Sequence, residues 1–256
     1  MRYNIHLYTL CYNEIDVLPF AVQYWSKLGV SKVVVYDNGS TDGSLGYMSL
    51  FPWIEVRHFE TEGQNDIVHR DIKNECWKES KGKADFVIVC DMDEFIYSND
   101  MDGVLDEMKK GGYNVLGTRW YMMCFDKRPV YDPDKFLHEQ GDKFYPQVIN
   151  HTKEWRHLGK FMLFDPNLVD SMNYSVGCHV SYPTPFIKLL ETDKAYAIHI
   201  NKGFSEDYFV ERRRIMGKNL SDVNRKWNMG IEYLRSEEDC RKEYRYYQAN
   251  SINVPF

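Results

Sequence analysis

The sequence contains no run of about 18 apolar residues, the length that a membrane-spanning helix needs. Its six cysteines form no CxxC pair, which argues against a zinc knuckle or a disulfide framework and for free thiols. The formal charge of −6 leaves no basic excess that would favour a nucleic-acid partner. Because the N-terminus lacks the long apolar stretch of a secretion signal, we expect a cytoplasmic protein.

Two common nucleotide-binding motifs are also missing. The glycines Gly39, Gly43 and Gly46 do not have the spacing of GxGxxG, and no GxxxxGKS/T sequence occurs. The sequence therefore predicts neither a dinucleotide-binding fingerprint nor a P-loop.

Strand and helix patterns alternate along the first 95 residues. This order predicts an α/β fold in which a mostly parallel central sheet carries helices on both faces. The predicted strands are 3–11, 32–36, 54–59 and 86–90, and the predicted helices are 18–28 and 66–80.

The second half of the chain is less regular. Residues 126–185 are rich in proline, glycine, aspartate, histidine and aromatics, which indicates irregular strands and loops that shape a substrate pocket. We expect a strand at 195–200, followed by a helix that Ser205 caps. We predict one domain over residues 1–220 and a C-terminal helical extension over residues 221–256.

The strongest chemical motif is Asp91-Met92-Asp93, directly after the apolar strand at 86–90. Side chains two apart on a strand share a face, so both carboxylates can converge on one point. A divalent cation keeps two adjacent buried carboxylates ionised, and carboxylate oxygens favour Mg²⁺ or Mn²⁺ over zinc. A solvated acidic turn is the alternative interpretation, since Glu94 follows directly.

Two other loops are predicted to end at the same edge of the sheet, where open α/β sheets bind their ligands. In the loop 37–42, Asp37 is placed to accept hydrogen bonds from a base or ribose, and Ser40 to approach a sugar or phosphate. The alternative is an ordinary turn, because Asn-Gly and Asp-Gly form turns anyway. The end of the first strand contributes the candidates Thr9, Tyr12 and Glu14.

Together these blocks resemble a known enzyme family. Residues 8–14 (Tyr-Thr-Leu-Cys-Tyr-Asn-Glu), 33–40 (Val-Val-Val-Tyr-Asp-Asn-Gly-Ser) and 87–95 (Val-Ile-Val-Cys-Asp-Met-Asp-Glu-Phe) are similar to GT-A fold glycosyltransferases. The resemblance is strongest to the family 2-like group whose metal motif reads Asp-x-Asp-Glu-Phe. It covers residues 3–125 well, and a weaker similarity follows at 197–209.

The resemblance implies a Rossmann-like GT-A fold, a nucleotide-sugar donor (a UDP sugar) and a Mn²⁺ or Mg²⁺ ion. In such an enzyme Asp37 would hold the base, and Asp91 would hold the ribose and the metal. Asp93 would ligate the metal that bridges the two phosphates, and His199 would be a metal or diphosphate ligand. His179 is the alternative to His199.

An inverting transfer, which the resemblance also implies, needs a carboxylate that takes a proton from the acceptor hydroxyl. Glu139 is the preferred general base because it lies in the pocket-forming segment. Asp132, Glu206 and Asp207 are the alternatives, although acidic residues at 206 and 207 also suit the first turn of a helix.

A cation on the helix before the metal strand could meet the diphosphate. The candidate is Arg70, and Lys73 and Asn74 lie on the same helix. The alternative is a solvated helix face.

The resemblance further implies a division of labour and a set of partners. Residues 1–125 would bind the donor and residues 126–220 the acceptor, which would be a glycan or a lipid-linked glycan in polysaccharide biosynthesis. The Gln-x-x-Arg-Trp block of processive members is absent, so we expect transfer of a single sugar. The basic and aromatic tail favours either peripheral contact with the inner face of the cell membrane or an oligomer contact.

Two other classes of protein fit part of the pattern. A haloacid-dehalogenase-like phosphatase also carries Asp-x-Asp after an apolar strand, and Asp91 would then attack phosphorus. A binding module for nucleotides or carbohydrates could keep the fold without catalysis, although the intact pair Asp91 and Asp93 speaks against it.

Overall fold

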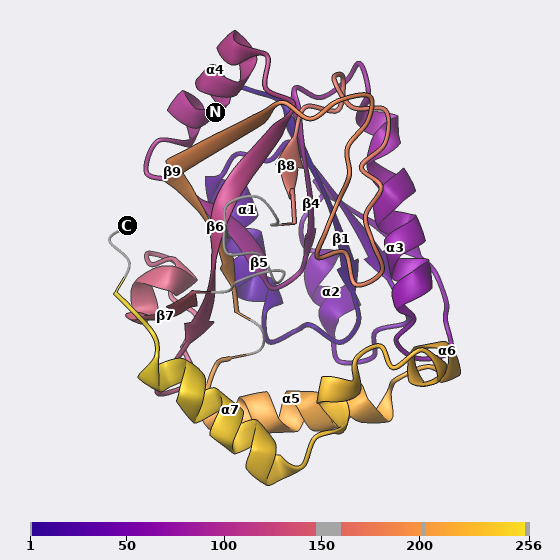
Figure 1. Ribbon diagram of the computed structural model, residues 1–256, viewed down its shortest axis with the longest axis vertical. Coiled ribbons are helices and arrows are strands. Elements are labelled where there is room, and N and C mark those ends of the chain that lie inside the picture. Colours follow the sequence, from indigo (N-terminus) through magenta and orange to yellow (C-terminus); the bar gives the residue numbers. More distant parts are fainter. Residues whose placement is uncertain (1, 147–159, 201–202, 254–256) are drawn as a thin grey trace.

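The computed structural model describes residues 2–146, 160–200 and 203–253 (Figure 1). Within these ranges nine strands form one sheet in the order β3-β2-β1-β4-β8-β6-β9-β5, and β7 pairs with β6. The strands are β1 (Ile5–Cys11), β2 (Lys32–Asp37), β3 (Ile54–His58), β4 (Phe86–Asp91), β5 (Glu94–Tyr97), β6 (Val115–Cys124), β7 (Lys143–Pro146), β8 (Leu163–Phe164) and β9 (Leu189–His199).

Helices connect and cover these strands. Among the described segments, none combines the length and the apolar character that a membrane crossing requires. The α-helices are α1 (Leu18–Lys27), α2 (Ser44–Met48), α3 (Asp66–Glu75), α4 (Met101–Gly111), α5 (Glu206–Lys218), α6 (Asp222–Lys226) and α7 (Glu237–Ala249), and the 3₁₀ helices are η1 (Cys76–Ser80), η2 (Leu137–Gln140) and η3 (Ile231–Leu234).

The sheet has a parallel part and a mixed part. Strands β3, β2, β1 and β4 are all parallel, with Cys11 opposite Asp37 and Leu10 opposite Asp91. Beyond β4 the sheet is mixed, since β8 is antiparallel to both β4 and β6, whereas β6 and β9 are parallel. The predicted α/β fold is confirmed, and the parallel part brings the carboxyl ends of β1, β2 and β4 to one edge.

The two faces of the parallel part carry separate apolar layers, as the alternation of side chains along a strand requires. On one face Leu7 belongs to the core that includes Trp25 of α1. On the other face Tyr8 belongs to a second core with Trp77 of η1. The predicted helices on both faces of the sheet are therefore confirmed.

Most predicted elements have their expected positions. The predicted helix 66–80 is α3 continued by η1, and Ser205 caps α5 by accepting a hydrogen bond from Tyr208 N at 3.2 Å. The strand predicted at 195–200 is the second half of β9, which begins at Leu189 and ends at His199. The irregular residues flanking β9 hid its first half from pattern analysis.

The C-terminal helices lie together across one end of the sheet, in orange and yellow at the bottom of Figure 1. The segment that connects α5 to α6 is bound to the residues just before α3. Gln64 N donates to Asn219 O at 2.6 Å, and Ser221 N donates to Gln64 O at 3.1 Å. Gly63 has a φ of +64°, and a Cβ there would lie 2.2 Å from Asn219 O. Only glycine therefore allows this close approach.

Candidate active site

A cavity of about 440 Å³ lies where β1, β2 and β4 end. Its wall includes residues from all three predicted loops, among them Tyr12, Glu14, Asn38, Asp91 and Asp93. Since parallel strands end at a common edge, the three loops converge although about 80 residues of sequence separate the first from the last. A cavity of this size and position is typical of a small-molecule site.

Four buried or cavity-facing charges, which we call the cavity cluster, surround the end of β4: Lys73, Asp91, Glu94 and Lys160. Lys73 Nζ contacts Asp91 Oδ1, and Lys160 Nζ lies 2.7 Å from Asp91 Oδ2 and also contacts Glu94. The side chain of Lys160 is 1% exposed, whereas that of Asp91 is 40% exposed. Asp91 is therefore the member that faces the cavity most openly.

The two ammonium groups keep Asp91 ionised. The surrounding protein disfavours the charged carboxylate, but the positive charges of Lys160 and Lys73 hold the pKa of Asp91 well below its ordinary value of 3.8. Burial alone would lower the pKa of Lys160, and the charges of Asp91 and Glu94 raise it well above 10.5 instead. Asp91 and Lys160 are thus both charged at neutral pH.

Asp93 and His199 form a second pair on the cavity wall. His199 Nε2 lies 3.5 Å from Asp93 Oδ2, because β9 pairs antiparallel with β5 and places His199 opposite Glu94. Burial would lower the pKa of His199, but the negative charge of Asp93 and contact with it raise that pKa above 6.5. The structure therefore places the predicted residue His199 beside the Asp91-Met92-Asp93 motif.

The donor set fits a divalent cation only in part. Asp93 and His199 offer one carboxylate and one imidazole to the cavity, whereas both oxygens of Asp91 contact ammonium groups. In the described ranges no group of three or more His, Cys, Asp or Glu side chains is placed to hold a metal. Ions such as Mg²⁺ bind through one or two carboxylates and the substrate's phosphates, and a mixed oxygen and nitrogen set suits Mn²⁺ as well. The arrangement fits an ion that binds together with a phosphate ligand.

The first loop is tied to α5 by a buried ion pair. Arg212 Nη2 lies 2.9 Å from Glu14 Oε1, and Arg212 Nη1 donates to Asn13 O at 3.1 Å. Both charged side chains are about nine-tenths buried, and both line the cavity. This pair fixes the predicted residue Glu14 as part of the wall and adds a cation from the C-terminal part of the chain.

The second loop is organised around Asp37, which is 1% exposed. Its Oδ2 accepts hydrogen bonds from Gly39 N at 2.9 Å and from Ser40 N at 3.0 Å. Its Oδ1 is buried and has no hydrogen-bond partner among the described residues. Ser40 Oγ accepts from Asn13 N at 2.9 Å, so Ser40 joins the two loops and does not itself line the cavity.

Besides Asp37 and Ser40, two more predicted donor-binding residues lie outside the cavity that the described residues form. Thr9 is buried in β1, and its hydroxyl faces Leu10 O at 3.4 Å. Arg70 is paired with its neighbour Asp71 at 2.8 Å. Lys73 is the cation of α3 that reaches the cavity.

The two predicted catalytic carboxylates also lie outside this cavity. Glu139 Oε2 accepts a hydrogen bond from Phe136 N at 2.6 Å and so caps η2. Asp207 is in the first turn of α5, is exposed, and pairs with Arg241 at 2.7 Å. Both carboxylates have local structural partners, and the catalytic roles remain predictions.

The sequence patterns predict neither the position of Lys160 nor the part of the wall that the C-terminal extension contributes. Lys160 follows the segment 147–159, which lies outside the described residues, and no pattern marks it. The extension supplies Met229, Gly230 and Tyr233 to the wall. A signal was available for α3, since Asp66, His69 and Lys73 have the i, i+3, i+7 spacing of one helix face and all line the cavity.

Comparisons with solved structures give distant similarities. The crystal structure of S. aureus TarS 1-349 is 17% identical, with a TM-score of 0.46, over 90% of this chain and 70% of that chain. The structure of glucosyl-3-phosphoglycerate synthase from Mycobacterium tuberculosis with Mn²⁺, UDP and glucosyl-3-phosphoglycerate is 14% identical, with a TM-score of 0.33, over 46% of this chain and 44% of that chain. No curated protein matches the chain.

The family comparison covers far more of the sequence. The model of glycosyltransferase family 92 matches residues 8–237, which include every element that lines the cavity. The match supports the predicted glycosyltransferase class and names family 92, while the closer resemblance to family 2-like enzymes is not confirmed. The chain belongs to glycosyltransferase family 92.

Proposed function

We propose that this family 92 member transfers a single sugar from a UDP sugar to a hydroxyl group of a glycan or lipid-linked glycan, with inversion and with the help of Mn²⁺ or Mg²⁺. The observation that carries the proposal is the cavity at the ends of β1, β2 and β4, which is lined by two cations, Lys73 and Arg212, and by several carboxylates. Such a site can hold an anionic diphosphate and polar sugar hydroxyls at once.

The base and ribose of the donor would lie toward the loop that follows β2. Asn38, Phe59 and His69 line this part of the cavity, and the rings of Phe59 and His69 meet edge to face at 6.0 Å. Asp37 Oδ1 is buried and, within the part of the chain that the structure describes, accepts no hydrogen bond, which is energetically costly for a carboxylate oxygen. We therefore propose that this oxygen accepts a hydrogen bond from the base of the donor. Asp37 would act after a small movement of its loop, since it does not line the cavity.

The metal would be held by Asp93 and His199, and it would supply countercharge to the diphosphate leaving group. Asp91, held by its lysines, would accept hydrogen bonds from hydroxyl groups of the donor. Arg212 adds a fixed positive charge to the same wall. The charge that develops as the glycosidic bond breaks would therefore meet preorganised groups.

The acceptor requires a carboxylate within hydrogen-bond reach of its hydroxyl. We keep Glu139 and Asp207 as the predicted bases and test each by a substitution to the amide. A general base is expected to contribute about 10²- to 10⁴-fold, with UDP affinity unchanged. If Glu139→Gln and Asp207→Asn retain full activity, the base is a carboxylate of the cavity wall.

The decisive experiment is a screen of nucleotide sugars by nucleotide release with Mn²⁺ present, using the parent protein, Asp93→Asn and the control Asp170→Asn. Asp170 is exposed and pairs at 3.7 Å with Lys81, and neither residue lines the cavity. We expect release from a UDP sugar, a loss of about 100-fold in Asp93→Asn, and no loss in the control. Equal activity of parent and Asp93→Asn would refute the metal assignment.

The same screen separates the two other interpretations of the sequence. A binding module would retain UDP and release none from any sugar nucleotide. A phosphatase would hydrolyse phosphate esters and trap phosphate on Asp91, and neither result is expected from the family match.

A further inference from the structure

The contacts of Asp91 are unusual because two lysines hold one carboxylate. Lys73 contacts Oδ1, and Lys160 lies 2.7 Å from Oδ2 while it also contacts Glu94. The contact between Lys160 and Asp91 Oδ2 does not depend on Lys73. Asp91 therefore keeps one cationic partner, which it shares with Glu94, when Lys73 leaves.

Both lysines are buried, but they differ in their partners and their position. Lys160 is 1% exposed, contacts two carboxylates and does not line the cavity, whereas Lys73 is 5% exposed and does line it. Lys73 projects from α3 onto the cavity wall, on the same helix face as His69 and Asp66. A rotation of the Lys73 side chain can therefore carry its ammonium group from Asp91 to a ligand in the cavity.

We infer that Lys73 is an exchangeable cation, which leaves Asp91 and binds the diphosphate when the donor enters. This inference rests on the proposed function and assigns a separate task to each lysine. An ammonium group is a strong phosphate partner, and the exchange replaces one ion pair by another. It also frees Asp91 Oδ1 on the cavity side for a ligand hydroxyl, while Lys160 still contacts Oδ2.

The inference predicts that Lys73 recognises the diphosphate and not the nucleoside. Titration calorimetry would compare UDP with uridine for the parent, Lys73→Met and Lys73→Arg, with Mn²⁺ present. We expect Lys73→Met to lose about tenfold in UDP affinity and to keep its uridine affinity, because only UDP carries the phosphates. Lys73→Arg is expected to recover most of the UDP affinity, since it restores the charge.

The matched control is Lys78→Met, which removes a partly exposed lysine that pairs with Glu75 just beyond the same helix. It is expected to leave both affinities unchanged, which excludes a general effect of net charge. Equal losses of UDP and uridine in Lys73→Met, or no loss of either, would overturn the inference. If Lys73→Met does not fold, Lys73→Gln replaces it, and equal losses of UDP and uridine affinity in that variant, or no loss of either, would overturn the inference in the same way.

Failure of the proposed function has a different outcome. In that case the parent protein binds neither UDP nor uridine, and the variants have no affinity to compare. A parent that binds UDP, together with a Lys73→Met variant that binds it equally well, rejects only the exchange.

Discussion

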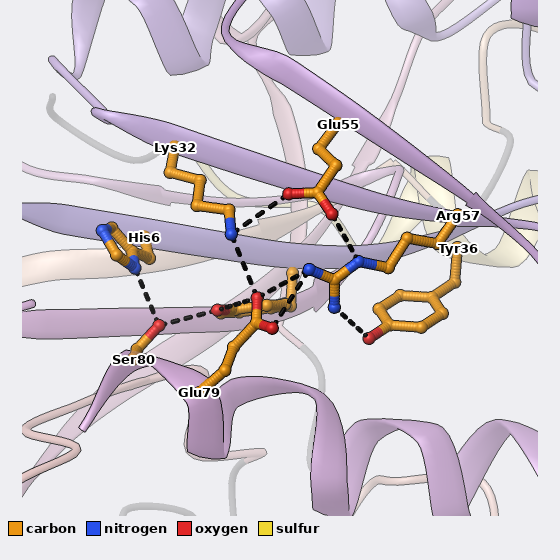
Figure 2. A network of polar contacts seen from close by, with 8 residues as sticks. His6, Lys32, Tyr36, Glu55, Arg57, Glu79 and Ser80 are labelled. Atoms are coloured by element: carbon orange, nitrogen blue, oxygen red, sulfur yellow. Dashed lines mark hydrogen bonds and ion pairs between the residues drawn. The ribbon is translucent and has the colours of Figure 1, made fainter. Parts of the chain in front are cut away.

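Two groups of charges on the same sheet have similar composition and different surroundings. One is the cavity cluster, and the other, which we call the sheet-face cluster, consists of Lys32, Glu55, Arg57 and Glu79 (Figure 2). Each group has two cations and two carboxylates. In the sheet-face cluster every side chain is between 30% and 45% exposed, whereas in the cavity cluster only Asp91 has substantial exposure.

The sheet-face cluster joins β2 and β3 to η1. Arg57 donates to both oxygens of Glu79 at 2.9 and 3.0 Å, and Tyr8 donates to the same carboxylate at 3.0 Å. Ser80 extends the network to His6, as Figure 2 shows. Because these side chains stay partly in water, forming the ion pairs requires little desolvation, and each pair stabilises the contact between η1 and the sheet only modestly.

In the cavity cluster, folding removes both lysines from water, and this desolvation has a large free-energy cost. Its one exposed carboxylate faces a cavity at the ends of parallel strands. Both clusters contain two cations and two carboxylates. What distinguishes the cavity cluster as a candidate functional site is therefore its burial and the cavity that it faces.

The largest expected difference concerns the fully buried cation. Replacing Lys160 by Met leaves Asp91 and Glu94 without their shared partner, and we expect a loss of about 3–5 kcal/mol in the free energy of unfolding. The matched variant Lys32→Met should lose about 1 kcal/mol or less. Urea unfolding measures both losses. An equal loss in the two variants would show that the burial of Lys160 makes no difference to stability.

The next largest difference between the two clusters should be in their effect on sugar transfer. Asp91→Asn keeps the shape of the side chain and removes its charge, and we expect sugar transfer to fall by about 100-fold. Glu79→Gln makes the same kind of change in the sheet-face cluster and should leave transfer unchanged. The nucleotide-release assay measures both, and comparable losses would show that exposure to the cavity is irrelevant.

A smaller effect is expected when Glu79 is replaced, and it concerns the stability of the fold. Glu79→Gln weakens its contacts with Lys32, Arg57 and Tyr8, and we expect a loss of about 1–2 kcal/mol in the free energy of unfolding at neutral pH. Chemical denaturation measures this loss. A variant as stable as the parent would mean that the network does not fasten η1 to the sheet.

The smallest effect is a dependence of stability on pH. Burial would raise the pKa of Glu79, but hydrogen bonds from Lys32, Arg57 and Tyr8 lower it below 4.5. A carboxylate with a lowered pKa in the folded state stabilises the fold above its unfolded pKa, and this contribution disappears as the pH falls below 4.5. Unfolding curves of the parent should therefore lose more stability between neutral and acid pH than those of Glu79→Gln.

Local patterns predicted the parallel part of the fold well. The apolar runs that became β1, β2 and β4 are almost entirely buried, and the rule that parallel strands end at one edge predicted the meeting of Glu14, Asp91 and Asp93. The helix cap at Ser205 followed from its hydroxyl and the acidic first turn. These features depend on residues close together in the sequence.

Features that depend on distant segments could not be predicted. Glu139 and Asp207 carry the right chemical group, but contacts with Phe136 N and Arg241 hold them at helix ends outside the cavity. The role of Lys160 depends on the approach of β8 to β4, which no periodicity in residues 126–185 reveals. The predicted extension lines part of the cavity, and the close approach of Gly63 to Asn219, just before the extension, is a contact between segments far apart in the sequence.

The most direct test of the account is a crystal structure of the protein grown with UDP and Mn²⁺. We predict that the diphosphate lies in the cavity beside Lys73, that the ion contacts Asp93 and His199, and that Lys160 still holds Asp91. UDP bound outside this cavity, or a saturated complex in which Asp91 keeps both lysines and Asp93 contacts no ion, would contradict the account.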